Sequence, residues 1–263
     1  MHKFLPPAAS QHAASIDAML EHVHWMVLVL FAGWAAYFVW VMFRYRAGRQ
    51  QEPALRGARG HLAMFVFAGV VVAEGVMLIG VGLPGWYERM VTRPTGGRPL
   101  VMRVVAQQFA WNVHFPGADG QFGETAMSLL SPTNPLGLNR ESPVGKDDLT
   151  FLSEIHVPVG RPVIVELTSK DVIHSFGVPE MRIKQDAVPG MDIPVWWVPT
   201  ITTEQMRKQL NNPKFVYEIA CAQLCGIGHA RMRAFVTVEE PADFQKWMDE
   251  QVAAASSEDS AWQ

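Results

Sequence analysis

Residues 25–43 read WMVLVLFAGWAAYFVWVMF, nineteen residues without a charge. A helix of about 20 apolar residues crosses the hydrocarbon core of a bilayer, so this stretch predicts a membrane span. Residues 62–83, LAMFVFAGVVVAEGVMLIGVGL, are apolar apart from Glu74 and predict a second span. Two core helices of a soluble protein are the alternative, but a soluble core helix carries a polar stripe and neither stretch has one. We therefore expect residues 25–86 to form a two-helix transmembrane hairpin.

The connector between the two spans is rich in arginine. Residues 44–60 hold five arginines and one acidic residue: Arg44, Arg46, Arg49, Arg56, Arg59 and Glu52. Because positive loops stay in the cytoplasm, the connector is expected there, and both ends of the hairpin on the outer side. Residues 1–24 lack the pattern of a removable signal and are expected to be an outer segment. In a bacterium the chain would be a multi-pass protein of the inner membrane, with the following domain in the periplasm.

The composition excludes two classes of function. With 263 residues and a formal net charge of −3, the chain is not basic enough for a DNA or RNA binder, so nucleic acid is not an expected partner. Two cysteines are too few for a disulfide-rich scaffold. The two thiols must therefore serve chemistry or a single bridge.

Beyond Pro84, proline and glycine become frequent and short alternating runs replace the long apolar ones. This change predicts an all-β domain over residues 87–240, an antiparallel sandwich or barrel. The expected strands are residues 101–115, 149–157, 162–168, 215–220 and 233–239, with a long surface loop over residues 116–146. Residues 241–263 predict a C-terminal helix, which begins at Pro241, and a tail. The domain from about Trp86 onward is expected to fold alone.

The strongest chemical motif follows the strand predicted at residues 215–220. It reads Cys221-Ala-Gln-Leu-Cys225-Gly-Ile-Gly-His229-Ala-Arg-Met232 and offers two thiols, an imidazole and a thioether. All four are soft or borderline metal ligands. His174, between two predicted strands, can supply a second imidazole. A thioether is a poor zinc ligand and a good weak axial copper ligand, so Met232 favours copper.

The second cysteine of the motif predicts a dinuclear copper centre. Both thiolates can bridge two copper ions, each of which takes one imidazole, while Met232 and the backbone carbonyl of Gln223 complete the two ends. With every position filled by protein, such a centre transfers electrons rather than making or breaking bonds. The alternatives are a disulfide between Cys221 and Cys225, a structural zinc site, and Met232 as a core residue. No CxxCH is present and no pair of facing histidines lies in the spans, so we expect no haem in this chain.

These features resemble subunit II of the haem–copper cytochrome c oxidases. The similarity includes the copper motif, the two-span hairpin, the run Gln108-Phe109-Ala110-Trp111, and residues 183–190 and 217–220. The resemblance implies a transmembrane hairpin followed by a cupredoxin-like sandwich that holds a copper A centre. It also implies electron uptake from cytochrome c and transfer to haem in subunit I, where oxygen is reduced to water with proton pumping. Oxidase subunit I, other oxidase subunits, cytochrome c and membrane lipid are the implied partners.

Two positions depart from the family pattern. Gln223 stands where the family usually has a glutamate that also binds magnesium; Gln223 keeps the carbonyl but is a poor magnesium ligand. Phe109 stands where the family often has the tryptophan at which electrons arrive from soluble cytochrome c. Electrons would then arrive through Phe109 or Trp111, or the donor would be a bound cytochrome or a donor complex.

Glu74 is costly within a span, so it predicts either a proton path or a hydrogen bond to a neighbouring subunit. Two other functions remain open from the sequence. One is the electron-accepting subunit of a copper A nitric oxide reductase, and the other is a membrane-tethered copper carrier. A nitrous oxide reductase is disfavoured by the two spans and by the absence of a large histidine-rich domain.

Overall fold

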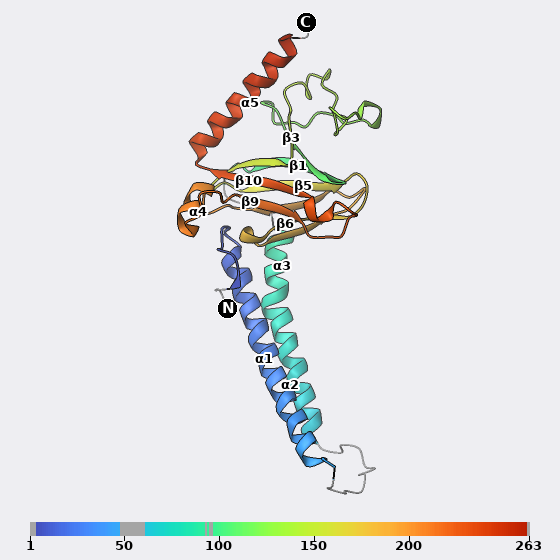
Figure 1. Cartoon of the computed structure of the whole chain (residues 1–263), viewed down its shortest axis with the longest axis vertical. Helices are drawn as coiled ribbons and strands as arrows, with labels where there is room; N and C mark the ends of the chain where they lie inside the picture. Colours follow the sequence, from blue (N-terminus) through green and yellow to red (C-terminus); the bar gives the residue numbers. More distant parts are fainter. Residues whose placement is uncertain (1–3, 48–60, 93, 95–96, 262–263) are drawn as a thin grey trace. The chain divides into compact units, whose positions relative to one another are not determined.

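The computed structural model describes residues 4–47, 61–92, 94 and 97–261 (Figure 1). The chain divides into two compact units. A helical unit contains Ser15–Val91, and a β unit contains Leu5–Ala14 together with Thr92–Gln263. The β unit is therefore built from two separate stretches of sequence.

The helical unit consists of two long apolar helices. The first is α1 (Ala13–Arg44), and the second runs through α2 (His61–Met77), a π-helical turn (Leu78–Gly82) and α3 (Leu83–Met90). Ala13–Arg44 and Ala63–Met90 are long and apolar enough to cross a membrane. α1 begins well before Trp25, at Ala13, and half of residues 13–24 are strong helix formers. Of the charged connector residues, Arg49, Glu52, Arg56 and Arg59 lie outside the described residues.

The β unit is a sandwich of two five-stranded sheets, ordered β3-β2-β1-β5-β8 and β4-β10-β9-β6-β7, which lie one over the other in Figure 1. The strands are β1 (Leu100–Gln107), β2 (Ala110–Phe115), β3 (Leu149–Leu152), β4 (Glu154–Pro158), β5 (Val163–Ser169), β6 (His174–Val178), β7 (Ile183–Ala187), β8 (Ile193–Trp197), β9 (Tyr217–Cys221) and β10 (Arg233–Glu239). The expectation of purely antiparallel sheets was wrong. β1 pairs with β5, and β4 with β10, in parallel.

The core lies between the two sheets. Along β1 every second residue is buried, so Met102 and Val104 face the core while Arg103 and Val105 face outward. Trp111 from one sheet and Phe176 from the other meet edge to face, with ring centroids 5.6 Å apart. Such contacts between large buried rings hold the two sheets together.

Two predicted strands are each broken in two. Residues 101–115 form the hairpin of β1 and β2, which turns at Gln108 and Phe109. Residues 149–157 form β3 and β4, which belong to different sheets. Between them Ser153 has a φ of 58°, the left-handed conformation that redirects the chain from one sheet to the other.

Several elements were absent from the prediction. These are strands β6, β7 and β8 and helix α4 (Thr203–Leu210). α4 begins with a capping box in which Thr202 and Gln205 each satisfy the other's backbone N–H, a pattern readable from the sequence. Helix α5 (Pro241–Ala261) continues through most of the predicted tail. Trp247 of α5 stacks on the ring of His156, with centroids 4.1 Å apart.

The segment Leu5–Ala14 is an integral part of the β unit. The N–H of Ala9 donates to the carbonyl of Glu180 at 2.8 Å, and the N–H of Thr200 donates to the carbonyl of Ala9 at 2.9 Å. Ala9 is fully buried, and His12 meets the Trp196 ring edge to face with centroids 4.4 Å apart. A domain that begins at Trp86 lacks this segment.

Candidate metal centre

The strand order brings the ends of the copper motif together. Cys221 is the last residue of β9 and Met232 directly precedes β10, the antiparallel neighbour of β9. The N–H of Cys221 donates to the carbonyl of Met232 at 3.2 Å. His174 is the first residue of β6, which pairs with β9 on its other side through Phe176 and Cys221. Three adjacent strands of one sheet thus bring together Cys221, Met232 and His174.

The thiols and imidazoles lie close together. The Sγ atoms of Cys221 and Cys225 are 3.8 Å apart. The Nδ1 atom of His174 is 3.9 Å from Sγ of Cys221, and the Nδ1 atom of His229 is 3.6 Å from Sγ of Cys225. Each thiol therefore has its own imidazole.

The two remaining donors complete a paired arrangement. The carbonyl oxygen of Gln223 lies 3.2 Å from Sγ of Cys221, and Sδ of Met232 lies 3.8 Å from Sγ of Cys225. Each thiol thus has one imidazole and one further weak donor beside it. The structure brings together all six groups that the sequence nominated.

The chemistry of the donor set fits a soft or borderline metal. Both cysteines are buried free thiols, and their 3.8 Å separation is far from the ~2.05 Å of a disulfide, against the disulfide alternative. Burial raises the pKa of the Cys225 thiol to about 11, and the hydrogen bond and charge of Cys221 add to the shift. A bound cation is the natural means of keeping two such thiols ionised. Within the described part of the chain, His174, Cys221 and Cys225 are the cluster whose ligand atoms lie within 4.8 Å of one another.

Asp171 orients His174 and was missed by the sequence reasoning. Its Oδ1 lies 2.8 Å from Nε2 of His174, and because an ionised carboxylate only accepts, the ring must donate its Nε2–H there. The Nδ1 atom is thereby left for a metal. Burial raises the pKa of Asp171, but hydrogen bonds from Gln108, His174 and Val172 outweigh it and hold the pKa below its usual value. A carboxylate three residues before a histidine ligand is the sequence pattern that could have found it.

The predicted electron-uptake residues lie beside the centre. Phe109, at the tip of the β1–β2 hairpin, lies against the backbone of Gly226 and Gly228, between Cys225 and His229. Trp111 is fully buried, with its ring centroid 6.2 Å from that of His174. Both rings adjoin the donors, but only Phe109 has exposed surface.

Glu74 belongs to the helical unit, where it lies in α2 with its side chain exposed.

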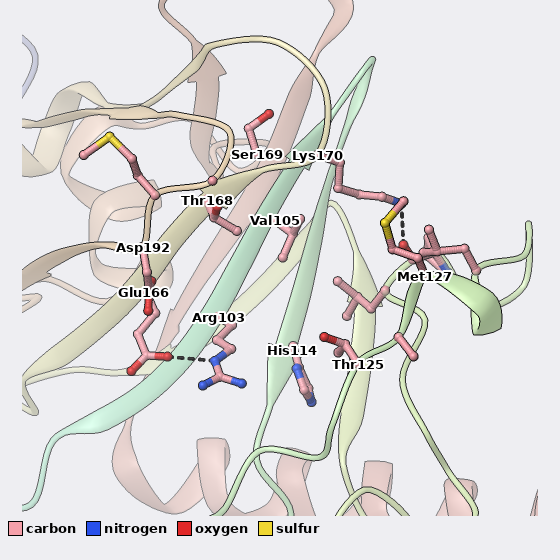
Figure 2. Close-up of a pocket in the computed structure, with 16 residues that line it drawn as sticks. Arg103, Val105, His114, Thr125, Met127, Glu166, Thr168, Ser169, Lys170 and Asp192 are labelled. Carbon is pink, nitrogen blue, oxygen red and sulfur yellow. Dashed lines mark hydrogen bonds and ion pairs between the residues drawn. The ribbon is translucent and has the colours of Figure 1, made fainter.

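A separate cavity of about 570 Å³ lies on the outer face of the sheet that contains β1 and β5 (Figure 2). None of the six donor groups lines it. Of its charged side chains, Arg103 binds Glu166 at 2.8 Å, and Lys170 donates to Gln107 and to the carbonyl of Pro135. The cavity is therefore distinct from the metal centre.

Comparison with known proteins identifies the family. The family model described as cytochrome c oxidase subunit II, periplasmic domain, matches residues 100–239, which run from the start of β1 to the end of β10. The chain belongs to the cytochrome c oxidase subunit II family. Its β unit is accordingly a cupredoxin-like sandwich, and members of this family are parts of a haem–copper oxidase, an oxidoreductase. The nitric oxide reductase alternative is not favoured.

Two relatives illustrate the breadth of this subunit II family. The chain is 33% identical over 237 residues to the alternative cytochrome c oxidase subunit 2 of Bradyrhizobium diazoefficiens, covering 90% of this chain and 80% of that one. It is 28% identical over 287 residues to cytochrome c oxidase subunit 2 of Thermostichus vulcanus, covering 97% and 81%. The crystal structure of the periplasmic domain of subunit II from Bradyrhizobium japonicum is 24% identical, with a TM-score of 0.41, and covers 60% of this chain and 96% of that one.

Proposed function

We propose that this subunit takes up electrons at a dinuclear copper A centre and passes them to haem in oxidase subunit I. Oxygen would be reduced to water in that partner, coupled to proton translocation. The observation that carries the proposal is the paired arrangement of donors, in which each of two thiols has its own imidazole and one weaker donor. The proposed ligands are His174, Cys221, Cys225, His229, Met232 and the carbonyl of Gln223.

Bound copper would supply a one-electron acceptor shared between two metal ions. The task of this chain is to hold the donors still, so that little rearranges when an electron arrives. Three adjacent strands hold the ends of both ligand-bearing segments, and a half-buried hydrogen bond to Asp171 fixes one imidazole. A rigid, fully protein-ligated centre favours electron transfer over bond chemistry.

We propose Phe109 as the place where the electron donor touches the chain. Its ring lies on the loop between Cys225 and His229, and it is partly exposed, whereas Trp111 has no exposed surface. The donor is cytochrome c or a bound cytochrome. Trp111 would then serve as a buried ring between the surface and His174.

The proposed topology is supported by the two stretches of sequence that make up the β unit. Leu5–Ala14 leads into the first apolar helix and Thr92–Gln263 follows the second, yet both belong to one compact unit. Both must then lie on the same side of the membrane, which two crossings provide. Arg44 and Arg46 follow the first apolar stretch in the connector, so the positive-inside rule favours a β unit in the periplasm of a bacterial inner membrane.

For Glu74 we propose a hydrogen bond to a neighbouring oxidase subunit, with proton uptake as the second candidate role. Glu74→Gln separates the two in the assembled complex. Unchanged turnover and pumping would leave the contact role, and loss of either with normal assembly would establish the proton path.

The copper proposal is tested on the full chain purified in detergent and loaded with copper. Two coppers per chain and a seven-line mixed-valence electron paramagnetic resonance signal are expected. Cys225→Ser should reduce the stoichiometry to one copper or none, whereas Met127→Ser, which removes the sulfur of a residue that is 87% exposed, should change nothing. One copper with a four-line signal in the unaltered chain, or zinc alone, would overturn the proposal. Rapid loss of copper to a mild chelator would point instead to a copper carrier.

A further inference from the structure

We propose that Gln108 is a positioning residue of the metal centre, which ties both ligand-bearing segments to the tip of the β1–β2 hairpin. The proposal rests on the copper centre proposed above. Gln108 is not itself a metal donor; it acts through Cys225 on one side and through Asp171 and His174 on the other.

The side chain of Gln108 holds the backbone at Cys225. Its Nε2–H donates to the carbonyl oxygen of Cys225 at 2.7 Å. Fixing this carbonyl fixes the peptide plane that follows Cys225, and with it the direction in which the thiol leaves the backbone. The Cys225 sulfur is the one beside both His229 and Met232, so its direction sets half of the centre.

The backbone of Gln108 holds the other segment. Its N–H donates to Oδ2 of Asp171 at 2.7 Å, while Oδ1 of the same carboxylate accepts from Nε2 of His174 at 2.8 Å. A carboxylate held at both oxygens has little freedom to rotate. Gln108 is therefore hydrogen-bonded directly to Cys225 and, through the carboxylate of Asp171, to the imidazole of His174.

The loop between Cys225 and His229 is shaped to receive the tip of the β1–β2 hairpin. Gly226 has a φ of 133°, and a Cβ there would lie 2.9 Å from Nε2 of Gln108. A Cβ at Gly228 would overlap the Phe109 ring. On its other side the loop faces solvent, since Leu224 is 78% exposed and Ile227 fully exposed. The hairpin tip is thus the support on which this part of the loop rests.

The neighbouring glutamine provides a matched control. Gln107 lies on the same hairpin, and its Oε1 accepts from Nζ of Lys170 at 3.0 Å. A glutamate at 107 keeps this acceptor, whereas a glutamate at 108 loses the donor to Cys225 and sets an oxygen against its carbonyl.

The experiment compares copper-loaded full chains in detergent: unaltered, Gln108→Met, Gln108→Glu and Gln107→Glu. Methionine keeps the length of the side chain without a donor or a charge, and Gln107→Glu controls for added negative charge. We expect both Gln108 variants to lose copper to a chelator about tenfold faster, as is common when the partner of a metal ligand is removed. Their hyperfine pattern and reduction potential should also shift, and Gln107→Glu should behave as the unaltered chain does.

The outcomes separate this proposal from the one on which it rests. If the unaltered chain holds no copper pair, the copper proposal itself fails. If it holds the pair, and both Gln108 variants keep its spectrum, potential and rate of copper loss, the positioning role is overturned and the copper centre stands. A lower unfolding temperature of the metal-free variants, with an unchanged spectrum and potential once loaded, would likewise overturn it.

Discussion

The ring of His174 and the carboxylate of Asp171 form a hydrogen bond of 2.8 Å that leaves Nδ1 of the imidazole directed at Cys221. Asp171→Asn keeps the shape of the side chain but removes its charge, so we expect copper affinity to fall by about tenfold. Chelator competition measures the change. Asp186→Asn is the control, because that carboxylate faces Lys184, 3.9 Å away, and should have no effect. Equal affinities for both variants would contradict the role of Asp171.

The contact between Phe109 and Gly228 predicts a strong coupling. Gly228 has φ −90° and ψ 3°, which alanine tolerates, so Gly228→Ala adds only a methyl group against the ring. Overpacking of this kind costs about 1–3 kcal/mol. In a Phe109→Ala background the space is open and the cost should largely vanish. Thermal unfolding of the unaltered chain, the two single variants and the double variant measures the coupling. Additive effects would show that the Phe109 ring does not rest on the loop.

The N-terminal segment predicts opposite outcomes at two adjacent alanines. Ala9 is fully buried in the β unit, whereas Ala8 is exposed. Ala9→Asp places an unpaired carboxylate in the core, so we expect it to lower the free energy of unfolding of the β unit by about 3 kcal/mol. Ala8→Asp should change it by less than about 0.5 kcal/mol. Limited proteolysis and thermal unfolding of the full chain compare the two, and similar stabilities would show that this segment is not docked.

His114 predicts a loss of stability in mild acid. The ring is buried, with Nε2 2.5 Å from Oδ2 of Asp148; burial lowers its pKa below 6.5, although Asp148 partly opposes the shift. The unfolded chain then binds a proton at a higher pH than the folded one, so stability falls as the pH drops through about 6.5 toward the folded pKa. Below the folded pKa this loss is complete.

His114→Gln keeps an N–H for Asp148 and cannot titrate in this range. The unfolding temperature of this variant should therefore depend less on pH between roughly 7.5 and 5 than that of the unaltered chain. His24→Gln, at an exposed position of α1, should leave the dependence unchanged. Equal pH dependence in all three chains would exclude His114 as the source.

The sequence predicted what depends on local pattern. The apolar runs were long enough to identify both helices, and the spacing of the cysteines, His229 and Met232 nominated donors that the fold brings together. His174 required one further assumption, that its loop lies beside the motif, and the pairing of β6 with β9 places it there.

Contacts between distant parts of the chain were not predictable in this way. β6 is buried at all five positions, so it lacks the alternation by which a strand is recognised. The hydrogen bond between Gln108 and Cys225 joins residues that are 117 positions apart in the sequence, and no periodicity reveals it. Ser153 adopts its left-handed conformation because the strands on either side belong to different sheets, a constraint imposed by the tertiary structure.

The docking of Leu5–Ala14 also fixes an order of events during biosynthesis. These residues leave the ribosome before either helix, but their partners, including Met181, which accepts from the Ser10 hydroxyl 171 positions away, are made long after both helices. In the proposed topology, Leu5–Ala14 would therefore wait on the outer side until the rest of the sandwich has followed it across the membrane. Completion of the β unit would thus report that both helices have crossed the membrane, because a chain with only one helix inserted would leave the two stretches in different compartments.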